Sequence, residues 1–185
     1  MKIALYGTFD VDNYGDLLFP HIANERYPEH DWTFVSPTNT PTSFADSKRT
    51  IDLATARQEE FDLIVIGGGN IVHTRPTNLP AYQKYNINQN AYPELWIGAA
   101  RNALEHGIPY VFNAPSITNL FASRIERVLF REVFNACQYL SFREEYSCDF
   151  ASQFSERQIH CVPDTAIQIA KIWPFEGNKK VERLW

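Results

Sequence analysis

A group of polar residues and one glycine follows the first apolar segment of the chain, residues 3–6. These residues are Asp10, Asn13, Tyr14, Gly15 and Asp16, and a helical pattern begins directly after them. Glycine permits close backbone approach, and the first amides of a helix form a natural anion site. Two interpretations stay open: a strand-to-helix loop capped by Asp16, or a site for an anionic or sugar ligand over the start of the helix.

Three consecutive glycines follow the clearest predicted strand, residues 62–66. Gly67, Gly68 and Gly69 lead into Asn70, with His73 close behind. Three glycines cost conformational entropy that a simple turn does not require. The pattern therefore favours a crevice in which a ligand or a neighbouring loop approaches the backbone. His73 is a candidate acid or base, although a lone loop histidine is more often a surface or hydrogen-bonding residue.

Polar residues also follow three later apolar segments. Asn113 and Ser116 are placed to bind a hydroxyl group or to satisfy loop backbone. Arg143 carries a planar guanidinium that suits a carboxylate or phosphate ligand, or an internal ion pair with an acidic neighbour. Asp164 is expected to cap the segment that follows it or to complete the crevice.

The cysteines and histidines do not have the spacing of a metal site. Cys137, Cys148 and Cys161 form no CxxC pair and are predicted to be free, buried thiols in a reducing compartment. His160 and Cys161 are adjacent on a predicted strand, so their side chains point to opposite faces and cannot share an ion. We therefore predict no metal site.

Short apolar segments alternate with helical patterns along the chain, which is typical of βαβ units. The predicted strands are residues 3–6, 32–35, 62–66, 110–112, 139–142 and 159–162, and the predicted helices are 17–26, 94–106, 121–134 and 144–154. Residues 37–50 are predicted to be a loop. Residues 74–92 form a second, longer predicted loop, of a length typical of a functional insertion or lid. Its Tyr82, Tyr85 and Tyr92 are candidates to stack on a sugar ring.

These elements predict an α/β fold with a Rossmann-like, doubly wound parallel sheet. Ligands of such sheets bind beyond the carboxyl ends of the strands, which is where the polar residues above are found. Gly107 is expected to end the helix before it. The predicted core face of helix 121–134 consists of Phe121, Ile125, Val128, Leu129 and Val133.

The composition suits one folded domain. The 185 residues are 44% hydrophobic, and 17 Lys and Arg against 22 Asp and Glu give a net charge of −5. An acidic chain without a basic run is a poor binder of nucleic acid or of an anionic membrane. It has no signal-peptide pattern and no apolar run long enough to cross a membrane, so we expect a cytoplasmic protein without integral membrane contact. The dinucleotide pattern GxGxxG and the P-loop pattern are also absent.

Four short pieces together resemble the polysaccharide pyruvyl transferase family. They are Asn-Tyr-Gly-Asp at 13–16, Gly-Gly-Gly at 67–69, Ser-Phe-Arg-Glu-Glu-Tyr-Ser at 141–147 and Val-Pro-Asp at 162–164. Each piece alone is a weak signal, but four in this order at the ends of strands are fairly specific.

The resemblance implies a transferase that moves the enolpyruvyl unit of phosphoenolpyruvate onto a sugar of a surface polysaccharide precursor. The product would be a ketal, released with phosphate, and no cofactor is implied. Family members resemble two facing Rossmann-type domains in the glycosyltransferase B arrangement. The arginine and histidine that grip phosphoenolpyruvate in the family lie in the second domain.

We therefore expect residues 1–172 to be the acceptor-side, amino-terminal domain and residues 173–185 to be a linker-like tail. A second domain or another copy of the chain would complete the enzyme. The predicted substrate-binding residues are Asp10, Asn13, Tyr14, Gly15, Asp16, Gly67, Gly68, Gly69, Asn70, Asn113, Ser116, Arg143 and Asp164, with His73 and Arg143 as weak catalytic candidates. Two alternatives stay open: a non-catalytic sugar- or nucleotide-binding module, and half of a glycosyltransferase that uses a nucleotide-sugar donor.

Overall fold

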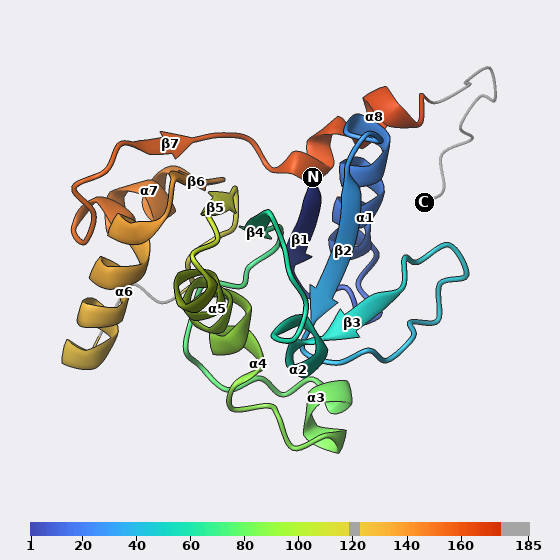
Figure 1. Ribbon diagram of the computed structural model, residues 1–185, viewed down its shortest axis with the longest axis horizontal. Helices are drawn as coiled ribbons and strands as arrows, with labels where there is room; N and C mark the ends of the chain where they lie inside the picture. The colour runs from blue at the N-terminus through green and yellow to red at the C-terminus, as the bar shows by residue number, and fades with distance from the viewer. Residues whose placement is uncertain (119–122, 175–185) are drawn as a thin grey trace, which may run out of the picture.

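A single parallel sheet organises the protein, whose computed structural model describes residues 1–118 and 123–174 (Figure 1). The sheet has seven strands in the order β3-β2-β1-β4-β5-β6-β7, and every neighbouring pair is parallel. The strands are β1 (Lys2–Tyr6), β2 (Asp31–Ser36), β3 (Thr50–Asp52), β4 (Leu63–Gly67), β5 (Tyr110–Asn113), β6 (Tyr139–Phe142) and β7 (Ile159–Cys161). The predicted doubly wound α/β fold is confirmed.

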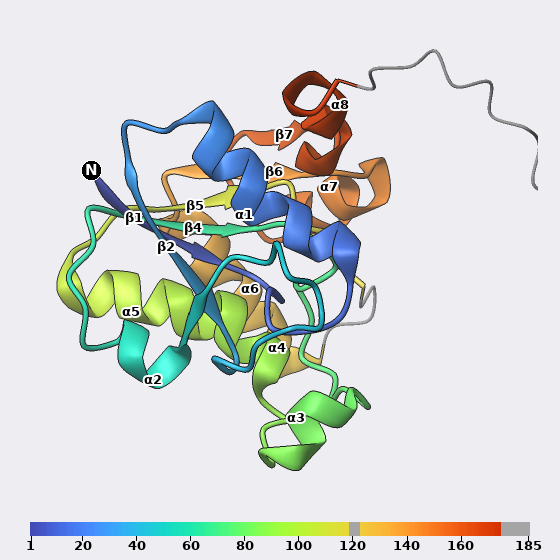
Figure 2. The same ribbon diagram turned by 90° about the vertical axis from the view of Figure 1, so that its right-hand side faces the viewer.

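Helices cover both faces of this sheet. They are α1 (Tyr14–Arg26), α2 (Leu53–Ala56), α3 (Pro80–Lys84), α4 (Ala91–Pro93), the π-helix η1 (Glu94–Gly98), α5 (Ala99–His106), α6 (Arg124–Ala136), α7 (Glu145–Ser152), the 3-10 helix η2 (Thr165–Gln168) and α8 (Ile169–Ile172). Figure 2 shows α1 and α8 on one face and α2, α5 and α6 on the other. The predicted helix end at Gly107 is confirmed, because Gly107 follows α5 with a φ of +68°.

The alternation of side chains along the strands divides the core into two layers. On β4, Ile64 and Ile66 belong to the larger layer, which the side chains of α5, α6 and α7 complete, whereas Val65 packs in the layer beneath α1. The larger layer is rich in aromatic rings, and Trp96 stacks on Phe130 with 5.1 Å between the ring centroids. Because both faces of the central strands are buried, these strands are apolar throughout.

The buried face of α6 differs from the predicted one. Its buried residues are Phe130, Val133 and Phe134, whereas Ile125 is 74% exposed and Val128 is 50% exposed. Only Val133 of the predicted stripe is therefore part of the buried face, and Phe121 lies outside the described residues. The stripe that contains the two phenylalanines is buried because these larger rings pack against Trp96 and the other aromatic side chains of the core.

Two short elements lie at or within segments that we predicted to be loops. Strand β3 begins at Thr50 and extends the sheet by pairing with β2, and helix α3 forms a single turn within the predicted loop 74–92. Both are too short to show a clear period in the sequence. Helix α1 also begins three residues earlier than predicted, at Tyr14.

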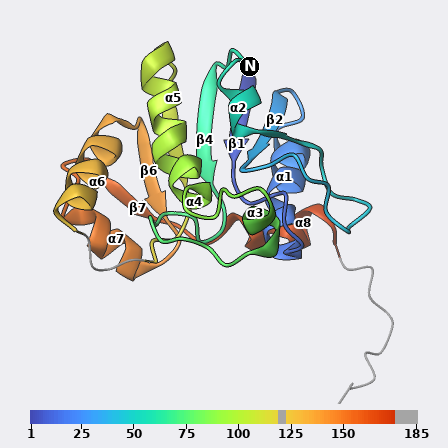
Figure 3. The ribbon, with the colours of Figure 1, turned by 90° about the horizontal axis from the view of Figure 1, so that it is seen from below.

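The segment that contains α3 crosses the carboxyl edge of the sheet, to which all strands point (Figures 1 and 3). At this edge the chain after β1 and the chain after β4 diverge to opposite faces, because the strand order reverses between these two strands. Such a switch point is the usual ligand position in doubly wound sheets. At the other end of the chain, Trp173 begins the predicted linker and lies edge-on to His21 of α1. Residues 175–185 of that tail lie outside the described residues.

The three cysteines are free, but they are not all buried as predicted. Cys137 is buried, Cys148 is half-buried and Cys161 is exposed. Cys161 ends β7, which is an edge strand of the sheet. Its neighbour β6 covers it on one side only, so the thiol reaches the surface.

Candidate functional site

A cleft of about 430 Å³ opens at the switch point between β1 and β4. Its lining residues come from the segments that follow β1, β4, β5, β6 and β7, with Phe19 from within α1. They are Thr8, Asn13, Gly15, Asp16, Phe19, Gly69, Asn70, His73, Arg75, Tyr92, Thr118, Arg143, Asp164 and Ala166. Nine of these residues were predicted: Tyr92 as a candidate to stack on a sugar ring, and as binding or catalytic candidates Asn13, Gly15, Asp16, Gly69, Asn70, His73, Arg143 and Asp164.

Asp16 lies at the base of the cleft in the first turn of α1. Its carboxylate does not cap the helix, because Oδ2 accepts hydrogen bonds from Thr8 Oγ1 at 2.8 Å and from Asn13 Nδ2 at 2.9 Å. Oδ1 lies against Gly69, where an added Cβ would be 2.8 Å from that oxygen. Burial raises the pKa of Asp16 more than these hydrogen bonds lower it. The site thus holds a poorly solvated carboxylate against the glycine turn.

The three glycines allow neighbouring groups of the protein to approach the backbone closely. Gly68 and Gly69 have φ angles of +82° and +68°, which L side chains rarely adopt. A Cβ on Gly67 would lie 2.7 Å from the Asn113 carbonyl oxygen, and one on Gly68 would lie 2.3 Å from the Phe19 ring. Of the three glycines, Gly69 lines the cleft, while Gly67 and Gly68 shape the turn behind it.

His73 and Tyr92 form an aromatic wall of the cleft, with 4.2 Å between their ring centroids. Burial lowers the pKa of His73, which keeps the imidazole neutral near pH 7. Its Nδ1 accepts a hydrogen bond from the Arg75 backbone N–H at 3.2 Å, which leaves the proton on Nε2. His73 is therefore a neutral hydrogen-bond donor rather than a cation.

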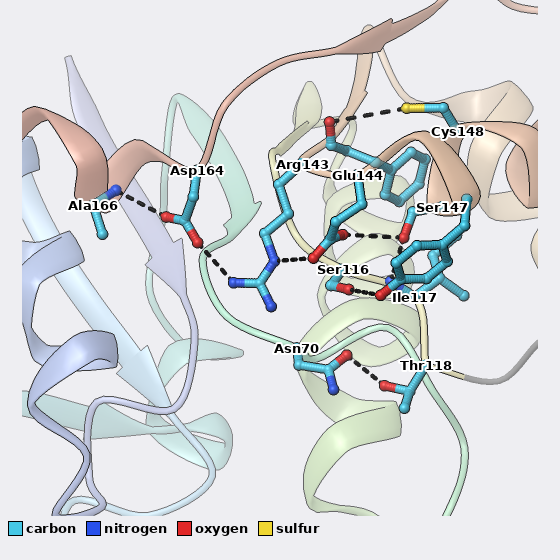
Figure 4. A network of polar contacts seen from close by, with 12 residues as sticks. Asn70, Ser116, Ile117, Thr118, Arg143, Glu144, Ser147, Cys148, Asp164 and Ala166 are labelled. Atoms are coloured by element: carbon cyan, nitrogen blue, oxygen red, sulfur yellow. Dashed lines mark hydrogen bonds and ion pairs between the residues drawn. The ribbon is translucent and has the colours of Figure 1, made fainter.

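Arg143 is held by two carboxylates, as Figure 4 shows. Its Nε donates to Glu144 Oε1 at 2.6 Å, and its Nη1 donates to Asp164 Oδ2 at 2.7 Å. Asp164 also accepts a hydrogen bond from the Ala166 N–H through Oδ1, so it both caps η2 and lines the cleft. The internal ion pair considered for Arg143 is thus present, and its positive charge is already balanced.

Asn70 and Thr118 lie next to each other below Arg143 and line the cleft, where the Thr118 hydroxyl donates a hydrogen bond to Asn70 (Figure 4). Ser116, one of the predicted binding residues, is buried and shares a hydrogen bond with the Tyr146 hydroxyl at 2.7 Å. Asn113 lines a separate small pocket under α1 and donates to the Thr165 hydroxyl. The structure therefore places Ser116 and Asn113 outside the cleft.

Two other predicted residues have partners away from the cleft. Both oxygens of Asp10 are occupied, since Oδ1 accepts from the Tyr82 hydroxyl at 2.7 Å and Oδ2 accepts from the N–H and hydroxyl of Thr38. Tyr14 is directed toward the loop after β2, where its hydroxyl donates to Asp46. Asp10 connects three segments of the fold, and neither residue lines the cleft.

The three tyrosines proposed to stack on a sugar are in different environments. Tyr82 is fully buried, so that proposal is wrong for it: its hydroxyl donates to Asp10 and its ring lies edge-on to Tyr92. Tyr85 is exposed, and its hydroxyl lies 3.3 Å from Thr40 Oγ1, away from the cleft. Tyr92 lines the cleft and is the one of the three placed to contact a ligand there.

Tyr82→Phe is expected to lower the free energy of unfolding by about 1.5 kcal/mol. The change leaves one oxygen of the buried Asp10 carboxylate without this hydrogen bond. Urea unfolding of both proteins measures the effect, and the exposed Tyr85→Phe is the matched control, with an expected change within about 0.5 kcal/mol. Equal effects of the two substitutions would show that the Asp10–Tyr82 bond does not stabilise the insertion.

Five lining residues were not predicted from the sequence: Thr8, Phe19, Arg75, Thr118 and Ala166. Arg75 is the most important of these, because it adds a second arginine at the cleft. Arg75 lies eight residues after the end of β4, so it is not among the residues that directly follow a strand. The ionised lining residues are then Arg75 and Arg143 against Asp16 and Asp164, so their formal charges cancel.

The described residues contain no group of three or more histidine, cysteine and acidic side chains placed to hold a metal ion. His160 stacks on Tyr139 with 4.7 Å between the ring centroids. No helix within residues 1–118 and 123–174 is both long enough and apolar enough to cross a bilayer.

The fold and the cleft together define a doubly wound α/β domain with a polar, formally neutral ligand site at its switch point. Comparison with known families is more specific. The family model described as polysaccharide pyruvyl transferase matches residues 13–185, and the chain belongs to this family. The resemblance inferred from the four short pieces is thereby confirmed.

Comparisons with individual proteins add little to this assignment. No curated protein matches the chain. One similar solved structure is that of a protein provisionally assigned as protease I from Bacteroides thetaiotaomicron. It is 14% identical, with 92% of this chain and 94% of that chain covered and a TM-score of 0.45. At this level the likeness carries no argument about function.

Proposed function

We propose that the cleft binds the sugar acceptor of a pyruvyl transfer reaction in which phosphoenolpyruvate is the donor. The observation that carries this proposal is the charge of the cleft: two arginines face two aspartates, and Arg143 is already paired with Asp164 and Glu144. Phosphoenolpyruvate carries up to three negative charges. A site without net positive charge is poorly suited to bind such an anion alone.

A saccharide suits the same cleft because its hydroxyl groups are neutral donors and acceptors. Oδ1 of Asp16 is placed to accept a hydrogen bond from a sugar hydroxyl, and Asn70 and the neutral His73 supply amide and imidazole groups. The ring of Tyr92 offers an apolar surface for the C–H face of a sugar. We assign Asp16 the central position in acceptor binding, since it lies at the base of the cleft and burial raises the pKa of its carboxyl group.

The reaction requires two hydroxyl groups of the acceptor. Both oxygens form bonds to C2 of phosphoenolpyruvate, the bond from C2 to the phosphate oxygen breaks, and the methylene carbon gains a proton to become a methyl group. The two hydroxyl groups lose two protons in total. One offsets the proton that the methylene carbon gains, and the other leaves on the phosphate. A carboxylate such as Asp16 favours the attack by accepting a hydroxyl proton, and its raised pKa brings it nearer to the pKa range of an effective base.

We further propose that cations from a second domain or from a second copy of the chain complete the donor site. Transfer to this donor needs positive charge at its phosphate and carboxylate groups. Arg75 and Arg143 together are balanced by the two aspartates of the cleft. Free thiols are typical of a reducing compartment, which supports a cytoplasmic setting for this reaction.

Calorimetry and a phosphate-release assay on the 185-residue chain test this function. We expect weak binding of a simple methyl glycoside and no release of phosphate from phosphoenolpyruvate, with or without the glycoside. Phosphate release by the purified chain would contradict the acceptor-side assignment. Absence of binding by every methyl glycoside tried would contradict the proposed function as a whole.

A further inference from the structure

Two cysteines from different elements lie together on the side of the molecule that carries α7 and β7. The Cys148 thiol of α7 lies 3.9 Å from the Phe142 carbonyl oxygen and 3.9 Å from the His160 carbonyl oxygen. Phe142 is paired in register with Cys161, and His160 immediately precedes it. Cys148 is therefore positioned over the end of β7.

The side chain of Cys161 faces the same layer of the core as Cys148. Ile159 packs in the larger core layer together with Cys148, and Cys161 follows Ile159 by two positions on the strand, so it points to the same face. His160 points to the opposite face, where it stacks on Tyr139. Strand register and side-chain alternation therefore both place the Cys161 side chain next to the Cys148 thiol.

We propose that Cys148 and Cys161 form a reversible redox site, which closes to a disulfide on reaction with a low-molecular-weight disulfide such as oxidised glutathione. In the first step the Cys161 thiolate attacks one sulfur of the oxidant, forms a mixed disulfide and releases one thiol. In the second step Cys148 attacks the Cys161 sulfur, forms the intramolecular bond and releases the second thiol. Two protein thiols are oxidised, and one disulfide is reduced to two thiols.

The environments of the two thiols determine this order of events. Cys161 is exposed and accessible to the oxidant, whereas Cys148 is half-buried. Burial, together with the neighbouring Cys161 thiol, raises the pKa of Cys148 to about 12, so its thiol is a poor first nucleophile. Once Cys161 has reacted, Cys148 is the adjacent thiol, and closure needs no diffusion.

The crosslink would connect the two segments that hold Arg143. Helix α7 begins at Glu145, directly after Glu144, and β7 leads through Pro163 to Asp164. Glu144 and Asp164 are the two carboxylates bound to Arg143 in the cleft. A bond between Cys148 and Cys161 therefore constrains both anchors of this arginine and couples the redox state to the wall of the cleft.

Oxidation of the purified full chain with oxidised glutathione tests the proposal. Intact-mass and peptide mass spectrometry are expected to show the loss of two hydrogen atoms and one Cys148–Cys161 crosslinked peptide, reversed by dithiothreitol. Cys148→Ser is expected to retain one glutathione on Cys161, and Cys161→Ser to form neither crosslink nor adduct at Cys148. Cys137→Ser is the matched control and is expected to crosslink as the unmodified chain does.

Thermal unfolding gives a second measurement that needs no variant. The crosslink closes a short loop, so the oxidised chain is expected to unfold about 5 °C higher than the reduced chain. A stable glutathione adduct on Cys161 without the crosslink would overturn the proposal, as would a crosslink between two chains. If Cys148→Ser fails to fold, Cys148→Ala replaces it with the same expected adduct.

Discussion

Asp16→Asn is expected to weaken the binding of a methyl glycoside by roughly 10- to 100-fold while leaving the protein as stable as before or more stable. The loss of binding follows from the loss of a charged acceptor, since a hydrogen bond to a charged group contributes about 1.5–3 kcal/mol. Asn keeps one carbonyl oxygen for Thr8 and Asn13, so the loop after β1 retains a partner.

The stability part of this expectation follows from the direction of the pKa shift. Burial raises the pKa of Asp16 in the folded protein, so the folded state binds a proton more tightly than the unfolded chain does. The ionised carboxylate therefore destabilises the fold once the pH rises above the ordinary aspartate range. An uncharged amide removes this cost. Binding to the unmodified chain is also expected to decrease on acidification at a higher pH than for an ordinary aspartate.

Calorimetric titration and thermal unfolding at pH 7 measure both parts of this prediction. Asp12→Asn is the matched control, because Asp12 lies in the loop just before α1, is exposed and does not line the cleft. It removes the same charge and is expected to leave glycoside binding unchanged. Equal losses of glycoside binding in the two variants would mean that binding depends on net charge and not on the position of Asp16. A lower unfolding temperature for Asp16→Asn than for the unmodified chain would mean that the Asp16 carboxylate stabilises the fold.

Arg143→Ala is expected to lower the free energy of unfolding by about 2 to 3 kcal/mol. The side chains of Arg143, Glu144 and Asp164 are 25%, 31% and 27% exposed, so all three are largely removed from solvent. Without the guanidinium, two neighbouring carboxylates lose their counter-charge, and this loss costs more than the intact pairs contribute. The prediction is measured by urea unfolding.

A combined variant separates the lost charge pairing from the lost packing. Arg143→Ala together with Glu144→Gln and Asp164→Asn is expected to be more stable than Arg143→Ala alone, because no unpaired carboxylates remain. Arg101→Ala is the control for removal of an arginine, since its pair with Glu105 is exposed and long at 3.9 Å. An unfolding curve of Arg143→Ala that coincides with that of Arg101→Ala would contradict the account of this cluster.

Much of the fold was predictable because the chemistry of its elements is local. The central strands are apolar on both faces, and Gly107 sits where a left-handed residue must end a helix. The α6 prediction failed because two apolar stripes overlap on that helix. The choice between them depends on rings from η1 and α7, which the local pattern does not contain.

The candidate site was only partly predictable, for a related reason. Asp10 lies in the loop after β1 and Asp16 in the first turn of α1 that follows it, yet Asp16 lines the cleft and Asp10 does not. The partners of Asp10 are Thr38 and Tyr82, which lie 28 and 72 residues away along the chain. Strand ends show where a cleft forms, but the identity of the side chains that enter it depends on such distant partners.

The central claim is that this cleft is the acceptor side of a pyruvyl transferase, and amide chemical-shift mapping tests it most directly. Nitrogen-15-labelled chain is titrated separately with phosphoenolpyruvate and with the methyl glycosides of glucose, galactose and mannose. If the cleft binds the acceptor, at least one glycoside shifts the amides of Gly69 and Asn70, while phosphoenolpyruvate at the same concentration leaves them unchanged. Shifts of these amides by phosphoenolpyruvate, with none caused by any glycoside, would contradict it.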